Sequence, residues 1–144
     1  MYEKILIPLD GSELAEIALP YAEEMGVRLG SEITLLSVSD SAEAPEYHKH
    51  QVYLDGVADS TKRGAKRYLE MPEEAIKVEK AIVVGEPAEE IVDYAEKEGI
   101  DLIIMATHGR SGISRWTLGS VAEKVVRAGT TPVLLVRALL ASDK

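Results

Sequence analysis

Short apolar runs alternate along the chain with longer segments in which apolar residues recur every three or four positions. Short runs of this kind are typical of buried strands, and the longer periodic segments are typical of helices with one buried face. The apolar runs predict strands at residues 4–9, 33–39, 76–84, 101–107 and 133–136. The periodic segments predict helices at residues 14–29, 54–69, 87–98 and 120–128. Strands joined by helical crossovers predict an α/β fold with a doubly wound parallel sheet.

Several positions modify this pattern locally. Pro20 lies inside the first helical segment, where it is expected to kink the helix or remove one hydrogen bond. Residues 40–50 show no periodicity and are predicted to form an exposed loop, and Pro72 is expected to stop the helix that follows. Lys80 interrupts the apolar face of the third strand, which favours an edge position in the sheet. Ser120 and Glu123 form a capping-box pattern at the start of the last helix.

Composition and charge narrow the class of protein. The 144 residues suit a single domain, and a formal net charge of −9 argues against binding to nucleic acid or to an anionic membrane surface. The absence of cysteine excludes disulfides, thiol catalysis and zinc–thiolate sites. No apolar run approaches the ~20 residues of a membrane span, and the first residues lack the pattern of a signal peptide. We therefore expect a cytoplasmic protein.

Two loops are candidates for the functional site, because ligands of doubly wound sheets bind beyond the carboxyl ends of the strands where the strand order reverses. They follow the first strand, at residues 8–12, and the fourth strand, at residues 107–120. The second loop contains Gly109, Gly112 and Gly119, and Gly119 precedes a helix start that favours anions. Arg110 and Arg115 add positive charge. The glycines and the cap also have a purely structural interpretation, as turns and a helix start.

Other site types find little support in the sequence. There is no Gly-Lys-Ser/Thr phosphate loop and no G-x-G-x-x-G after the first strand. Ser111 lacks the second glycine of a nucleophile elbow, and the third strand ends without the aspartate of a phosphoacceptor domain. The histidines lack the spacing of a metal site. His108 lies in the second loop, and the sequence leaves open whether its ring takes part in the site or faces solvent. Trp116 is expected to pack on the surface or at a subunit contact.

The second loop resembles the signature of the nucleotide-binding universal stress proteins. That signature is Gly, two residues, Gly, nine residues, Gly, then Ser or Thr, and it falls here on Ala106, Gly109, Gly119 and Ser120, with alanine at the first position. Residues 5–12 are similar to the start of the family and residues 131–136 to its last strand. The resemblance implies a three-layer α/β/α sandwich with a five-stranded parallel sheet of order 3-2-1-4-5. It covers essentially the whole chain, which we interpret as one domain, residues 1–144, with a tail at 138–144.

The resemblance also implies ATP, ADP or AMP bound over the first and fourth strands, with Mg²⁺ bridging phosphate oxygens. Asp10 would reach the ribose or the base, although it could equally cap the turn at Gly11. The backbones of Leu9 and Val38 would flank the base. The implied binding residues are Pro8, Leu9, Asp10, Val38, Met105, Ala106, Gly109, Arg110, Gly119, Ser120 and Val121.

Three functions fit these expectations. The first is a dimeric nucleotide-binding sensor or regulatory module, with a homodimer formed through the last strand, Val133–Val136, as the resemblance implies. The second is a slow Mg²⁺-dependent ATPase or phosphotransferase, for which no dedicated general base is identifiable. The third is a dimeric interaction protein that has lost nucleotide binding, with Ala106 as the lesion.

Overall fold

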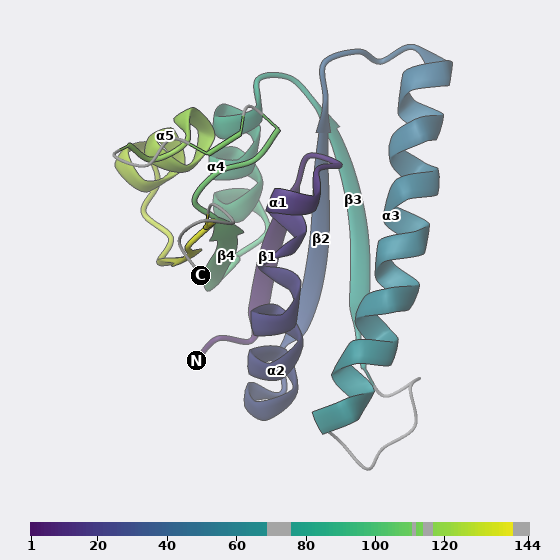
Figure 1. The fold of residues 1–144 in the computed structure, drawn as a ribbon, viewed down its shortest axis with the longest axis vertical. Helices are drawn as coiled ribbons and strands as arrows, with labels where there is room; N and C mark the ends of the chain where they lie inside the picture. The colour runs from purple at the N-terminus through teal and green to yellow at the C-terminus, as the bar shows by residue number, and fades with distance from the viewer. Residues whose placement is uncertain (69–75, 111, 114–116, 140–144) are drawn as a thin grey trace.

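The computed structural model describes residues 1–68, 76–110, 112, 113 and 117–139. Strands and helices alternate along the chain, as Figure 1 shows. In chain order they are β1 (Lys4–Leu9), α1 (Glu13–Glu16), α2 (Leu19–Leu29), β2 (Glu32–Ser39), α3 (Ala44–Ala65), the short 3-10 helix η1 (Lys66–Tyr68), β3 (Val78–Val84), α4 (Pro87–Lys97), β4 (Leu102–Ala106), α5 (Ser120–Ala128) and β5 (Val133–Val136).

The strands form one parallel sheet in the order β3-β2-β1-β4-β5, which confirms the predicted fold class and strand order. The predicted edge position of the third strand is also confirmed, since β3 lies at one end of the sheet. The order reverses between β1 and β4, because the chain moves outward from β1 to β2 and β3 and then returns to the other side of β1.

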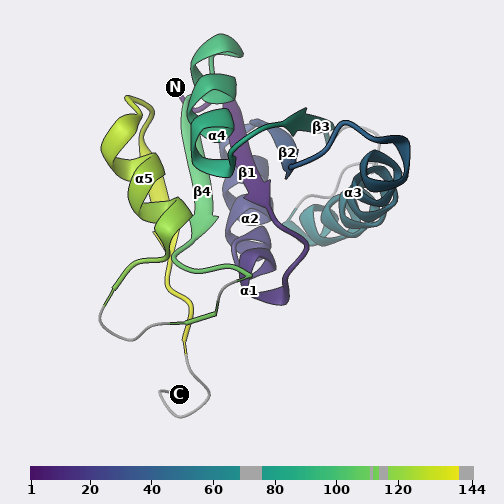
Figure 2. The same ribbon diagram turned by 90° about the horizontal axis from the view of Figure 1, so that it is seen from above.

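The core consists of two layers, one on each face of the sheet, because successive side chains of a strand point to opposite faces. On one face Ile5 and Ile7 of β1 pack with apolar residues of α1, α2 and α3. On the other face Leu6 of β1 packs with apolar residues of α4 and α5. Figure 2 shows these two groups of helices on opposite sides of the sheet. The result is a three-layer α/β/α sandwich.

The first predicted helix is divided in two. α1 ends at Glu16 and α2 begins at Leu19, so that Pro20 stands in the first turn of α2. Proline is tolerated there because a first-turn N–H has no partner within the helix. The predicted kink is thus a break between two helices, and Gly30 ends α2 with a left-handed φ of 67°.

The prediction of a loop over residues 40–50 is wrong, because α3 begins at Ala44. The buried residues of this helix begin only at Leu54, so its first turns lack the apolar periodicity that identifies a helix. Its start is marked instead by Pro45 and Glu46 in the first turn. Leu69 and Pro72, which were expected to end the helical segment, lie outside the described residues.

The predicted capping box at the last helix is also wrong. Gly119 takes the extended N-cap conformation, and Ser120 is the first helical residue. The tail expected at residues 138–144 is described only for its first residues, of which Ala138 is buried and Leu139 exposed. Among the described helices, none combines the length and the apolar character needed to cross a membrane.

Candidate functional site at the carboxyl edge of the sheet

The two candidate loops meet at the point where the strand order reverses. The backbone N–H of Arg110 donates to Asp10 Oδ2 at 2.7 Å, and the Arg110 guanidinium donates to the Asp10 carbonyl at 2.9 Å. These bonds join residues 100 positions apart in the chain. In Figure 2 the segment after β4 reaches the loop between β1 and α1. The tertiary structure therefore brings the two predicted loops into one site.

Asp10 organises the first loop as well as the contact with the second. Its Oδ1 accepts hydrogen bonds from the Ser12 N–H at 2.9 Å and from the Ser12 hydroxyl at 2.5 Å. Ser12 in turn caps α1 by accepting from the Ala15 N–H at 3.2 Å. The structural role that the sequence left open for Asp10 is therefore present.

The charge of Asp10 is stabilised by its surroundings. Burial alone would raise the pKa of this carboxyl, but the hydrogen bonds from Ser12 and Arg110 and the positive charge of Arg110 outweigh burial. The pKa is therefore held below its usual value of 3.8, and Asp10 is ionised at neutral pH.

Gly109 allows the close approach of the two loops. A Cβ atom at this position would collide with the Asp10 carboxylate. A larger residue would thus displace the Asp10 carboxylate from its present position or separate the two loops.

The start of α5 lies against the end of β4. The Gly119 N–H donates to the Thr107 carbonyl at 2.8 Å, and a Cβ on Gly119 would lie 2.8 Å from that same oxygen. The first helical hydrogen bond runs from the Glu123 N–H to the Gly119 carbonyl at 3.0 Å. In the part of the chain that the structure describes, no side chain caps this helix. The N–H groups of its first turn, which begins at the exposed Ser120, are therefore suited to an anion.

The remaining predicted site residues lie at the same edge of the sheet but are mostly buried. Leu9 ends β1, and its side chain belongs to the core. Val38 is the penultimate residue of β2 and packs against the opposite core layer. Met105 and Ala106 end β4 and are both 6% exposed. Pro8 is likewise buried in β1, whereas Val38 is only partly buried.

The structure excludes a solvent-facing ring for His108, one of the alternatives that the sequence left open. The residue is 8% exposed, its Nδ1 lies 2.9 Å from Thr107 Oγ1, and its Nε2 lies 2.6 Å from the Thr117 carbonyl. Sequence reasoning missed this residue because its partners are a loop carbonyl and a side chain whose placement depends on the fold. The predictions for Ser111, Arg115 and Trp116 fall outside the described residues.

His50 is a second residue whose role the sequence did not indicate. Its Nδ1 lies 2.5 Å from the hydroxyl of Ser37, which is buried in β2, and this contact joins α3 to the sheet. Among the described residues, no group of three His, Cys, Asp or Glu side chains is placed to hold a metal ion.

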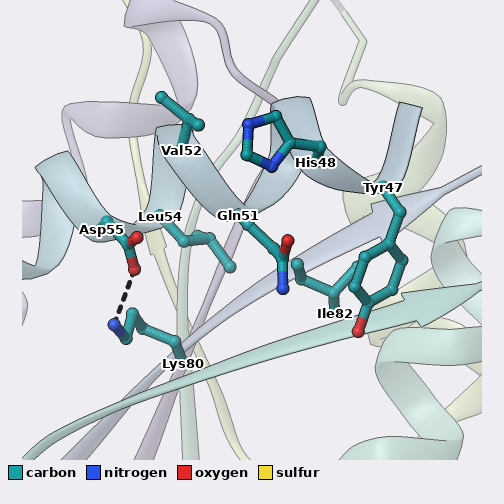
Figure 3. Close-up of a pocket in the computed structure, with 8 residues that line it drawn as sticks. All are labelled: Tyr47, His48, Gln51, Val52, Leu54, Asp55, Lys80 and Ile82. Carbon is teal, nitrogen blue, oxygen red and sulfur yellow. Dashed lines mark hydrogen bonds and ion pairs between the residues drawn. The ribbon is translucent and has the colours of Figure 1, made fainter. Parts of the chain in front are cut away.

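A separate pocket lies between α3 and β3, as Figure 3 shows. Its volume is about 320 Å³, and an ion pair of 2.6 Å between Lys80 and Asp55 lies at its edge. The lining residues are Tyr47, His48, Gln51, Val52, Leu54, Asp55, Lys80 and Ile82. None of them belongs to the two loops that meet at Asp10, so this pocket is distinct from the candidate site.

Fold and site together define a class of α/β protein in which a helix begins at the switch point of a parallel sheet, beside two loops joined by hydrogen bonds. The model of the universal stress protein family matches residues 1–137. The universal stress protein MJ0577 of Methanocaldococcus jannaschii is 38% identical over 156 residues, which covers 95% of this chain and 96% of the relative. The universal stress protein YxiE of Bacillus subtilis is 30% identical over 148 residues, which covers 95% of this chain and 100% of the relative. The chain therefore belongs to the universal stress protein family.

Solved structures agree with this assignment. The structure of MJ0577 superposes with a TM-score of 0.73 at 37% identity, with 98% of this chain and 99% of the other covered. UspA from Lactobacillus plantarum superposes with a TM-score of 0.77 over 94% of this chain and 98% of its own. Its identity of 24% supports the shared fold alone.

Proposed function

We propose that this protein binds an adenine nucleotide at the carboxyl edge of β1 and β4 and acts as a dimeric sensor or regulatory module. The observation that carries this function is the start of α5, which receives no side-chain cap from the residues that the structure describes. It lies against the end of β4 and next to the loops joined by Asp10 and Arg110. The phosphate chain would accept hydrogen bonds from backbone N–H groups of Ser120 and Val121. The ribose and the base would lie toward Asp10, Leu9 and Val38.

Two solved structures of this fold are described as a universal stress protein in complex with cAMP and one from Archaeoglobus fulgidus in complex with dAMP. They are 23% and 19% identical to this chain, so their likeness concerns the fold. The support in this chain comes from the glycine contacts and the helix start. Mg²⁺ would be held mainly by phosphate oxygens, because the carboxylate of Asp10 already accepts hydrogen bonds from Ser12 and Arg110. The bound ion would offset the negative charge of the phosphates.

Calorimetric titration with adenosine, AMP, ADP and Mg²⁺–ATP tests this function. We expect affinity to rise with the number of phosphates, because the helix start and Arg110 act on charge. Failure to bind any of these ligands at millimolar concentration would remove the nucleotide function and leave only the fold.

Two substitutions at Ser120 separate the backbone from the side chain. Ser120→Pro removes one N–H at the first helical position, where proline is well accommodated, and the extended conformation of Gly119 suits a following proline. We expect it to weaken ATP binding by about tenfold, the equivalent of one hydrogen bond to a charged group. Ser120→Ala removes only the hydroxyl and is expected to have a smaller effect. Equal affinity of the proline variant and the wild type would exclude the backbone contact.

Ala106 distinguishes this function from an interaction protein that has lost nucleotide binding. Its side chain is buried at the end of β4, so we expect Ala106→Gly to leave nucleotide affinity nearly unchanged and to lower stability. Binding that is detected only in the glycine variant would favour the interaction protein.

For the alternative of a slow ATPase, we expect single-turnover assays to show no phosphate release above background.

A further inference from the structure

His108 has both ring nitrogens engaged in a buried network at the end of β4. Nδ1 lies 2.9 Å from Thr107 Oγ1 and Nε2 lies 2.6 Å from the Thr117 carbonyl. The Thr107 hydroxyl also accepts a hydrogen bond from the Ala138 N–H at 2.9 Å. The network therefore joins three segments: the end of β4, the approach to α5, and the chain that leaves β5.

The partners of the ring determine its tautomer. A carbonyl oxygen can only accept, so Nε2 must carry the proton that faces Thr117. In the neutral ring Nδ1 is then an acceptor, and the Thr107 hydroxyl donates to it while accepting from the Ala138 N–H. One neutral tautomer thus satisfies every group in the network.

The network holds the start of α5 at two points. Thr107 binds the Gly119 N–H through its carbonyl, and His108 binds the Thr117 carbonyl through its ring. Both contacts come from adjacent residues, so the approach to the helix is fixed relative to the sheet edge. An anion at a helix start interacts strongly only within the first turn, and a small displacement of that turn weakens the contact.

We propose that His108 is a positioning residue, which holds the start of α5 where it can bind the phosphate chain of the nucleotide. This role rests on the proposed nucleotide function. His108 would therefore affect the binding of the phosphate chain and not the contacts to the adenosine part of the nucleotide.

Two substitutions test the contact from Nε2 to Thr117. The side-chain amide of His108→Gln reaches as far as Nε2 and can still donate to the Thr117 carbonyl, whereas the shorter amide of His108→Asn reaches only the position of Nδ1. We expect the asparagine variant to bind ATP about tenfold more weakly, the glutamine variant to stay within about threefold of the wild type, and adenosine to bind all three equally. Loss of adenosine and ATP affinity in parallel, or asparagine binding like the wild type, would overturn the positioning role.

Two control variants separate positioning from stability. Thr107→Val removes the hydroxyl that contacts Nδ1 but retains the backbone carbonyl that binds Gly119 and the contact from Nε2 to Thr117. We therefore expect a lower Tm and a phosphate-specific loss smaller than that of His108→Asn. His48→Asn changes an exposed histidine outside both loops, and we expect neither affinity nor Tm to change. A phosphate-specific loss in Thr107→Val as large as in His108→Asn would show that the Thr117 contact is not decisive.

The tautomer provides a test that needs no nucleotide. In ¹⁵N NMR spectra the His108 ring should show a slowly exchanging proton on Nε2 and an unprotonated Nδ1. The opposite tautomer, or a rapidly exchanging ring proton, would overturn the positioning role and leave the proposed function intact. Failure of the wild type to bind any nucleotide would overturn both.

Discussion

At the scale of single residues, the candidate site is organised by a carboxylate that serves two loops. Asp10 receives three hydrogen bonds on its carboxylate oxygens, two from Ser12 and one from Arg110. Each favours the ionised form, and together they outweigh the cost of partial burial. We propose that the same carboxylate contacts the nucleotide. A change at Asp10 is therefore expected to affect both nucleotide affinity and the contact between the two loops.

Asp10→Asn tests whether the hydrogen bonds to the ionised carboxylate of Asp10 outweigh the cost of its partial burial. Because the folded pKa of Asp10 is depressed, its contribution to stability is present above the unfolded pKa and is lost as the pH falls below 3.8. We expect the variant to lower the free energy of unfolding at pH 7 by about 1–3 kcal/mol and to reduce the loss of stability below about pH 4. Urea unfolding across this pH range measures both effects. The exposed Asp93→Asn should change neither, and an unaltered acid profile in Asp10→Asn would contradict the pKa shift.

Two glycines differ in whether the structure has room for a side chain at their positions. A Cβ on Gly119 would lie 2.8 Å from the Thr107 carbonyl and 3.2 Å from the His108 Cα, and backbone atoms cannot move aside as a flexible side chain can. A Cβ on Gly56 in α3 would meet nothing within 4 Å. We expect Gly119→Ala to destabilise by about 1–3 kcal/mol and Gly56→Ala to stabilise by about 0.5–1 kcal/mol. Thermal unfolding of the two variants should shift in opposite directions.

At the scale of elements, α3 is joined to the rest of the fold by polar contacts as well as by its apolar face. The Tyr53 hydroxyl donates to Glu16 Oε2 at 2.8 Å, which connects α3 to α1 beside the loop of Asp10. His50 contacts Ser37 on β2. These contacts help to explain why the beginning of α3 is helical although its first turns bury no residue.

Tyr53→Phe tests the connection between α1 and α3. Burial, the hydrogen bond to Glu16, and the charges of Glu16 and Asp10 all raise the pKa of Tyr53. The contribution of Tyr53 is therefore present below the unfolded pKa of about 10 and is lost as the pH rises above it. We expect the variant to lose about 0.5–1.5 kcal/mol at pH 7 and to resist alkaline unfolding better than this loss alone would predict.

Unfolding by urea at pH 7 and above pH 10 measures this difference. The exposed Tyr21→Phe, with 54% of its surface accessible, is the matched control and should behave like the wild type. An identical pH profile for Tyr53→Phe and Tyr21→Phe would mean that Tyr53 is not ionised differently in the folded and unfolded states.

At the scale of the whole molecule, β5 lies at one end of the sheet and is the strand through which a homodimer is expected. The carbonyls of Pro132 and Val136 face β4, because they accept from the Ile103 and Thr107 N–H groups. Since N–H and C=O groups alternate in direction along a parallel strand, those of Val133 and Leu135 point away from β4. Pairing of two β5 strands would bury these outward groups.

Hydrogen exchange tests the dimer without any substitution. In a dimer formed through β5, the amides of Val133 and Leu135 should be as protected as those of Leu134 and Val136. Sedimentation equilibrium should then give the mass of two chains. A single-chain mass together with rapid exchange at Val133 and Leu135 would contradict the expected dimer.

The sequence by itself determined the order of strands and helices, because a buried face leaves a periodic record of apolar residues in the chain. It also placed both candidate loops, since ligands of doubly wound sheets bind beyond the carboxyl ends of the strands and the glycines mark close approaches. The family resemblance added the strand order that the structure confirms. Sequence pattern failed where no apolar record exists, as in the first turns of α3, and at α5, where Gly119 rather than Ser120 takes the cap position.

Only the tertiary structure decided which polar groups meet. The contact of Asp10 with Arg110 spans 100 positions, and the ring of His108 depends on a carbonyl nine residues further along the chain. A hydrogen bond requires its two partners within about 3 Å and in the correct orientation, and it imposes no period on the sequence. The helices and strands could therefore be predicted from local sequence pattern. The hydrogen bonds within the candidate site could not, because they form only when distant segments pack together.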